Sequence, residues 1–442
     1  MNGGDEIPEA LSAAELRDIW PIATIADRVE GFKLLRRGEA EDLFLGLAPR
    51  DQAPLLLSLP REEQRSWMRL LPPDDAADLV QAAAAEQRGA LLDLLDEPTR
   101  NEVNALLAYA ADAAGGLMNP RYARLRPDMT VDEAISYLRK QARERLETIY
   151  YVFVLDDRQR LVGVVSFREL FSATSETRVQ EVMRTDVVTV PEHQDQEAVS
   201  RLFATTGLLA IPVVDDENHI KGIITVDDIV GVVQQEATED IQKAGGMEAL
   251  DAPYLAIAFR RMVRKRAGWL SALFLGEMLT ATAMAYFETE IARAVVLALF
   301  VPLIISSGGN SGSQASTLVI RAMALGEVRL RDWWRVIRRE LAAGLVLGGV
   351  LGSIGFLRIV LWQAVSPLYG EHYLLVALTV FGSLIGVVTF GTLAGSLLPF
   401  VLRRFGFDPA SASAPFVATL VDVTGLVIYF SVASVILRGT LL

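Results

Sequence analysis

The chain has 442 residues, a net charge of −13, three histidines and no cysteine. These features exclude a disulfide framework and a thiolate metal site, and the negative charge disfavours nucleic acid as a partner. Any bound metal is therefore expected to be a cation that prefers oxygen ligands. The chain is charged up to about residue 267 and almost wholly apolar afterwards, so we predict a soluble region fused to a membrane region.

Residues 1–116 are predicted to form short helices stacked into a superhelix. Their acidic, polar start lacks a signal-peptide pattern. Leucines followed closely by proline recur at Leu47, Leu59 and Leu71, and such prolines are typical of positions just beyond a helix end. The regular spacing favours helical repeats. This region is expected to be the first of four domains.

Two acids in this region, Asp74 and Asp78, stand four residues apart and so share one face of a helix. The pair is a candidate for binding a cation. Acids in a first helical turn are also common for a simpler reason, because they interact favourably with the helix dipole. The residues alone leave both interpretations open.

Residues 117–240 repeat one pattern of strand, turn, strand and helix with a period of about 60 residues. This tandem resembles a pair of CBS domains, which are α+β regulatory modules that often bind adenine nucleotides. Ser166, Thr225 and Asp228 fall where such modules hold a ribose. The resemblance therefore implies ATP as a candidate ligand.

Residues 241–267 are predicted to form a connecting amphipathic helix. Apolar residues recur there at helical spacing, and the other face is basic through Arg260, Arg261, Arg264, Lys265 and Arg266. Such a helix beside a membrane span is expected to lie on anionic lipid headgroups. It could serve as an anchor or as a gate.

Five membrane spans are predicted, at residues 268–287, 292–324, 340–364, 373–400 and 411–437. The second is expected to be broken by its glycines. Basic residues cluster before the first span, between the second and third, and before the fifth. By the positive-inside rule, the N-terminus and the soluble region are cytoplasmic and the C-terminus is outside. The expected location is the cell inner membrane.

One carboxylate, Asp422, lies near the middle of the fifth span. A charge there costs about 2.5–3.5 kcal/mol on insertion scales, so such residues usually face a wet cavity or a partner. We interpret Asp422 as part of an ion pathway. The alternative is an Asp that only hydrogen-bonds a neighbouring helix, for example through Thr419 or Thr424. Glu277 in the first span is a second candidate carboxylate.

Small and polar residues fill positions 306–314 of the second span, including Asn310. They imply either close helix packing or backbone that faces a cavity. Asp408 lies just outside the inner end of the fifth span. It could meet an ion at the mouth of a pore, cap the turn that begins at Pro409, or do both.

The domain order and three motifs, at residues 236–243, 302–321 and 408–429, resemble the MgtE family of magnesium channels. The resemblance implies a homodimer with one pore between its membrane regions and Mg²⁺ as the transported ion. Asp422 matches the pore carboxylate of the family, and Asp408 and Asn310 are further candidates for the pore. A wide site that holds a hydrated ion suits Mg²⁺, which gives up its waters reluctantly.

The resemblance also implies that cytosolic Mg²⁺ binds between acidic surfaces and holds the channel shut. The candidate regulatory ligands are Asp74, Asp78, Asp195, Glu197, Asp228, Glu236, Glu239 and Asp240. An ion that binds the compact state better shifts the population towards it. Gly207, Gly231 and Ala414 depart from the family pattern, so the number of regulatory ions stays open.

The resulting hypothesis is a multidomain α-helical membrane protein that takes up Mg²⁺ and is not an enzyme, because no nucleophile–base set or P-loop is present. Two alternatives remain. Glu277 and Asp422 could carry protons or sodium in a coupled exchanger of divalent metals. The second alternative is a nucleotide sensor whose membrane spans serve only as an anchor. Selectivity among divalent metals stays open.

Overall fold

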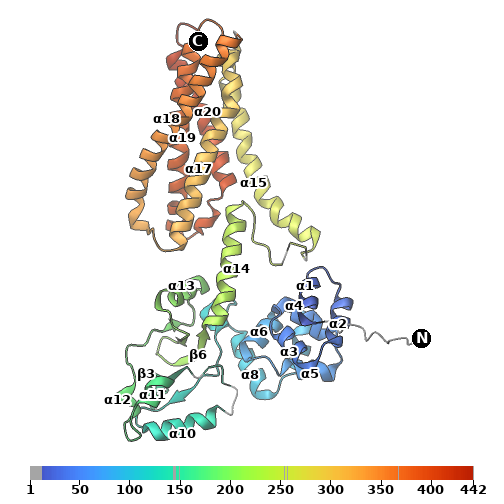
Figure 1. Ribbon diagram of the computed structural model, residues 1–442. Coiled ribbons are helices and arrows are strands. Elements are labelled where there is room, and N and C mark those ends of the chain that lie inside the picture. The colour runs from blue at the N-terminus through green and yellow to red at the C-terminus, as the bar shows by residue number, and fades with distance from the viewer. Residues whose placement is uncertain are drawn as a thin grey trace, which may run out of the picture. The chain divides into compact units, whose positions relative to one another are not determined.

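The computed structural model describes residues 12–142, 146–148, 150–252, 254–255, 257–366 and 368–441. It divides into two compact units, Met1–Gln235 and Glu236–Leu442. Figure 1 shows the elements of each unit. We describe the soluble unit first and the unit with the membrane helices second.

The soluble unit begins with short helices, as predicted. Ser12, Thr24 and Asp96 cap three of them through their side chains, and Pro49 and Pro73 occupy first turns. The helices are α1 (Ala13–Ile19), α2 (Ile25–Leu34), α3 (Arg37–Leu45), α4 (Pro49–Leu57), α5 (Arg61–Met68), α6 (Pro73–Ala82), α7 (Ala85–Leu92), α8 (Glu97–Leu106) and α9 (Ala114–Leu117).

Two sheets with the same topology follow. In each, a short strand pairs in parallel with a second strand, which pairs antiparallel with a third. The strands are β1 (Arg124–Leu125), β2 (Tyr151–Leu155), β3 (Leu161–Ser166), β4 (Val190–Pro191), β5 (Ala210–Val214) and β6 (Ile220–Thr225). The helices are α10 (Val131–Gln141), α11 (Phe167–Ser172), α12 (Val179–Val182), α13 (Gln196–Thr206) and α14 (Val226–Ala244). The predicted tandem of α+β modules is confirmed.

One hydrophobic core joins the helical region to the second of these modules. Leu79 and Val80 of α6 belong to the same buried cluster as Ile211 of β5 and Ile224 of β6. Burial of apolar surface is the main force that holds such elements together. The acidic face of α6 thereby lies near the start of α14.

The second unit holds five helices that are long and apolar enough to cross a membrane, as predicted. Its elements are α15 (Phe259–Tyr286), α16 (Glu288–Arg293), η1 (Val295–Phe300), α17 (Val301–Ala324), η2 (Leu330–Asp332), α18 (Trp333–Val365), α19 (Tyr373–Arg404), η3 (Pro409–Ser411) and α20 (Ala414–Ile436). Buried side chains of α19 and α20 supply much of the core.

The connecting segment differs from the sequence expectation of one helix over residues 241–267. Helix α14 ends at Ala244, where Gly246 takes a left-handed conformation with φ of +72°. Helix α15 then begins at Phe259 and runs to Tyr286 without a break. The basic residues therefore belong to the same helix as the first span.

The glycines of the second span do not break it, contrary to expectation, because they are used for packing. Gly308 and Gly312 of α17 lie against Gly391 and Gly395 of α19, backbone to backbone. A methyl group on Gly391 would meet the carbonyl of Gly308, and one on Gly395 would meet that of Gly312. Small residues four apart on both helices permit this close approach. The packing interpretation of these glycines is therefore supported.

Replacing Gly395 with alanine is expected to lower the thermal unfolding temperature of the purified protein. The added carbon would lie 2.8 Å from the carbonyl carbon of Gly312, and overpacking of this kind costs about 1–3 kcal/mol. Gly349→Ala in α18 is the matched control, since nothing lies within 4 Å of its added carbon. Equal unfolding temperatures for the two variants would contradict the close approach.

Candidate functional site

The fifth span places Asp422 inside the membrane unit. Helix α20 begins at Ala414, where the Ser413 side chain accepts a hydrogen bond from the Phe416 amide and Pro415 occupies the first turn. Asp422 is half-buried. Among the residues that the structure describes, its carboxylate has no hydrogen-bond or ion-pair partner. An ionised carboxylate without a protein partner at membrane depth requires water or a cation.

The two threonines predicted as alternative partners of Asp422 form their hydrogen bonds elsewhere. The Thr419 hydroxyl donates to the Pro415 carbonyl at 3.0 Å, and the Thr424 hydroxyl donates to the Leu420 carbonyl at 2.7 Å. Threonine in a helix often bonds to its own preceding turn in this way. Neither hydroxyl is therefore used for Asp422.

Glu277 and Asn310 lie on the helices that flank α20. Glu277 on α15 is exposed and is close enough to Asp422 to act on it electrostatically. Asn310 on α17 is also exposed, and its only described contact is with the Ser306 hydroxyl at 3.5 Å. The structure thus brings Glu277 towards Asp422, whereas Asn310 makes no bond to it.

Asp408 is fully engaged. One carboxylate oxygen accepts a hydrogen bond from the Ala410 amide at 2.8 Å, so the predicted capping role is confirmed. The other accepts from the Lys243 ammonium at 2.6 Å. Its predicted role towards an ion in the pore stays a prediction, because Lys243 occupies that oxygen here.

Acids of the soluble unit gather around one buried amide. The side-chain amide of Asn119 donates to Asp74 at 3.0 Å and to Glu147 at 2.6 Å. Asp74 comes from α6, and Asp228 from the first turn of α14 acts on it electrostatically. Asp78 follows one turn after Asp74 on α6. We call Asp74, Asp75, Asp78, Glu147 and Asp228 the acid cluster.

Crowding changes the proton affinity of the acid cluster. Burial, followed by repulsion from Asp228, raises the pKa of Asp74 to about 9. Desolvation and then repulsion from Asp75 raise the pKa of Asp78 to about 7. Desolvation and Asp228 likewise raise the pKa of Glu147 to about 7. Ionised together, these carboxylates destabilise the contact unless a cation joins them.

The described residues contain no group of three acids or histidines already arranged as a metal site. The acid cluster would therefore have to tighten around an ion. Sequence reasoning found Asp74, Asp78 and Asp228 but missed Asp75 and Glu147. Asp75 follows Asp74 directly and could have been included. Glu147 lies outside every helix and strand, so no periodic pattern marks it.

Without divalent cations, the thermal stability of the full chain is expected to fall as the pH rises. Asp74 and Asp78 have ordinary pKa values of 3.8 that are raised to about 9 and about 7, so the folded chain binds more protons than the unfolded chain in this window. Their favourable contribution is present at acid pH and is lost as the pH passes the raised values. Unfolding scans in chelator between pH 5 and pH 9 measure this.

Magnesium should reverse this loss, and it should do so more at the alkaline end, where fewer protons compete for the carboxylates. The variant Asp78→Asn should flatten the pH dependence. A stabilisation by Mg²⁺ that is equal at all pH values would contradict the role given to the acid cluster.

The remaining predicted regulatory acids lie outside the acid cluster. Asp195 caps α13 by accepting from the Glu197 amide at 2.9 Å, and Glu197 pairs with Arg201 at 3.4 Å. Three further acids lie on the later part of α14, in the second unit, and one of them pairs with Lys243; they are Glu236, Glu239 and Asp240. The roles of these acids in binding a metal stay predictions.

The candidate nucleotide positions occupy equivalent places in the two modules. Ser166 ends β3 and caps α11, with its amide donating to Glu169 at 2.8 Å. Thr225 ends β6, and its hydroxyl donates to Asp228 at 2.6 Å. A movement of the Thr225 side chain would therefore directly affect its hydrogen bond to Asp228, which belongs to the acid cluster.

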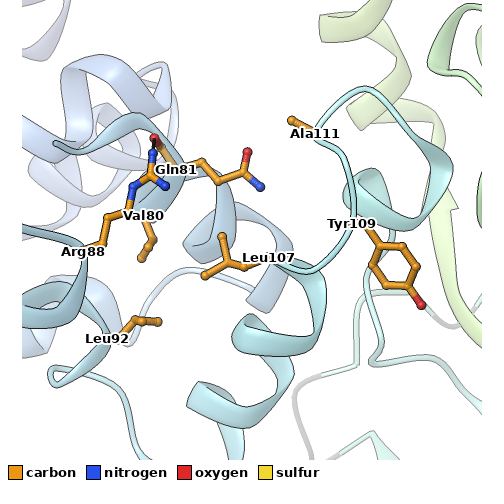
Figure 2. Close-up of a pocket in the computed structure, with 7 residues that line it drawn as sticks. All are labelled: Val80, Gln81, Arg88, Leu92, Leu107, Tyr109 and Ala111. Atoms are coloured by element: carbon orange, nitrogen blue, oxygen red, sulfur yellow. Dashed lines mark hydrogen bonds between the residues drawn. The ribbon is translucent and has the colours of Figure 1, made fainter. Parts of the chain in front are cut away.

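A pocket in the helical region carries no acid. Figure 2 shows its lining, which is apolar except for the polar ends of Gln81, Arg88 and Tyr109. The Arg88 guanidinium donates to the carbonyls of Gln81 and Ala83 at 2.8 and 3.2 Å, so it closes the C-terminal end of α6. The lining residues offer no carboxylate to a divalent cation.

The chain thus combines five helices long and apolar enough to cross a membrane, a carboxylate on one of them without a described partner, and a group of crowded acids outside them. This combination is expected of a membrane protein that handles cations. The family model for MgtE, described as a divalent cation transporter, matches residues 301–432. The model for the MgtE intracellular N domain matches residues 11–112, and the CBS domain model matches 114–176 and 179–235. The chain belongs to the MgtE family.

Relatives match over nearly the whole chain. The magnesium transporter MgtE of Thermus thermophilus is 41% identical over 98% of this chain and 95% of that protein. The magnesium transporter MgtE of Enterococcus faecalis is 30% identical over 99% of each. A solved structure of the cytosolic domain of the Mg²⁺ channel MgtE in complex with ATP is 40% identical, with a TM-score of 0.47, over 51% of this chain and 92% of that one.

Family membership confirms the resemblance found in the sequence. It also confirms that the chain is a transporter and not an enzyme. Together with the five apolar helices, it identifies a multi-pass membrane protein.

Proposed function

We propose that this chain forms a homodimeric channel for Mg²⁺ uptake that closes when cytosolic Mg²⁺ binds its soluble region. Transport of Mg²⁺ is supported by the relatives named as magnesium transporters over almost the full length of the chain. The observation that carries the proposal is the unpaired carboxylate of Asp422 within a membrane helix.

In the proposed dimer, two Asp422 carboxylates flank one pore and hold a hydrated ion through its waters. None of the most apolar window of α15 is buried within the chain, so this surface is open to a dimer contact. That surface needs lipid or a second copy to cover it. The soluble units lie in the cytoplasm of this arrangement, and the C-terminus lies outside the inner membrane.

In the proposed gating, the acid cluster is the principal sensor. Its carboxylates repel one another when they are empty, and a divalent cation would draw α6 and α14 together. Glu236, Glu239, Asp240, Asp195 and Glu197 are the further candidate ligands. ATP is proposed to bind near Ser166, Thr225 and Asp228 and to modulate the sensor through the bond between Thr225 and Asp228.

A coupled exchanger is the second candidate function. The proximity of Glu277 to Asp422 favours it, because two neighbouring carboxylates could carry a proton or a sodium ion.

Flux into vesicles, with Mg²⁺ varied separately on each side, tests the proposal. A channel predicts flux that follows the membrane potential and needs no counter-ion. It also predicts that Mg²⁺ on the side of the soluble domain inhibits flux. Flux that requires a proton or sodium gradient would favour the exchanger. The absence of any flux would refute transport.

A further inference from the structure

One lysine joins two distant parts of the second unit. The ammonium of Lys243, in the last turn of α14, lies 2.6 Å from a carboxylate oxygen of Asp408, a residue 165 positions later. It also lies 2.5 Å from Glu239, one turn earlier on α14. We propose that Lys243 is a built-in cation that fastens the end of α14 to the start of α20 and so sets the Mg²⁺ dependence of the proposed channel.

A short series of contacts connects the ion pair of Lys243 and Asp408 to the start of α20. The second oxygen of Asp408 caps the turn η3 at the Ala410 amide, 2.8 Å away. The carbonyl of Ala412, in the next turn of chain, accepts from the Ser316 hydroxyl of α17 at 2.7 Å. Ser413 then caps α20. Asp408 is thus held at one oxygen by α14 and at the other by the turn that leads into the helix of Asp422.

A second contact at the same place is independent of charge. Gly246 ends α14 in a left-handed conformation and is buried. A methyl group on it would lie 2.9 Å from the indole nitrogen of Trp269 on α15 and 3.0 Å from the Pro415 ring of α20. The end of α14 therefore lies directly against the first turn of α20, and the ion pair of Lys243 is part of a packed junction.

Lys243 stays charged in this junction. Desolvation opposes the charge, but hydrogen bonds to Asp408 and Glu239 outweigh it and raise the pKa of Lys243. Without the ammonium, Asp408 and Glu239 would be left as two acids that repel each other across the junction. The lysine therefore performs, within the chain, the charge neutralisation that a bound cation performs at a crowded acid site.

The functional test uses full-length protein in vesicles and rests on the proposed function. In Lys243→Gln, the Mg²⁺ concentration on the soluble-domain side that halves flux is expected to rise about tenfold, because the proposal places this ion pair in the closed arrangement and the variant loses it. Lys243→Arg should stay within about twofold of wild type, since it keeps the charge.

An unchanged or lowered half-inhibiting concentration in Lys243→Gln would overturn the inference, and so would a shift of equal size in Lys243→Arg. Absent flux in the wild type would instead refute the proposed function. These two failures are distinguishable because the junction can be probed without transport.

Zero-length coupling with a carbodiimide gives that probe. It joins the Lys243 amine to a carboxylate as an amide while the carbodiimide takes up the water and leaves as a urea. We expect peptides linked between Lys243 and Asp408 in digests of the full-length protein, and none in Lys243→Gln. Recovery of only the link between Lys243 and Glu239, within one helix, would overturn the fastening of α14 to α20.

Discussion

Substituting Asp422 with asparagine is expected to reduce Mg²⁺ flux to the level of protein-free vesicles. The substitution keeps the shape of the side chain and removes its charge, so the loss would report the carboxylate itself. No described protein group pairs with Asp422, and therefore no hydrogen bond of the fold is broken. Flux assays in vesicles and growth of a magnesium-requiring strain both measure the effect.

Thr424→Val is the matched control for Asp422→Asn. Among the described residues, its hydroxyl bonds to the preceding turn of α20, so flux should persist. Glu277→Gln separates the two candidate functions, since a channel should tolerate it and an exchanger that uses both acids should not. Normal uptake by Asp422→Asn would refute the pore assignment.

Removing two charges from the acid cluster is expected to leave the channel open at Mg²⁺ concentrations that close the wild type. In Asp75→Asn with Asp78→Asn, the half-inhibiting concentration should rise about 100-fold, which corresponds to roughly one tenfold factor for each lost charge. Both residues lie on α6, and neither makes a side-chain hydrogen bond within the described chain. Flux against Mg²⁺ on the soluble-domain side measures the shift.

Glu86→Gln on α7 removes an acid of the same helical region outside the acid cluster, so it should leave the half-inhibiting concentration unchanged. A shift of equal size in Glu86→Gln would mean that net charge, rather than the acid cluster, controls inhibition. An unchanged value in the double variant would place the sensor elsewhere.

Local signals in the sequence were sufficient to predict the membrane spans, the two α+β modules and the position of Asp422 within the last span. Hydropathy predicted the five spans, and a repeated strand pattern predicted the two modules. A lone Asp in an apolar run is visible without any structure. The boundary predicted between the connecting helix and the first span, at residue 267, does not exist. Apolar and basic residues around 260–268 form one continuous helical pattern with no breaker between Arg266 and the first span, so α15 runs through this position.

The contacts between distant residues were not predictable in the same way. Asn119 joins Asp74 to Glu147, and Lys243 joins α14 to Asp408, across sequence separations that no periodicity encodes. The sequence predicts that Asp408 could meet an ion at the mouth of a pore. Only the tertiary structure shows that the cation paired with Asp408 is the ammonium group of Lys243. Positions carried over from the family, such as Asp195, proved to have local capping roles here.

The glycine contact between α17 and α19 restricts how the membrane unit can move. Where two main chains touch, no side chain can change rotamer to absorb a displacement, so these helices should travel together as one rigid pair. Helix α15 is the better candidate for a movement that widens an ion path, because none of its most apolar window is buried within the chain. During evolution, the size of the residues at the contact between α17 and α19 should be tightly limited, whereas residues on α15 should vary more freely.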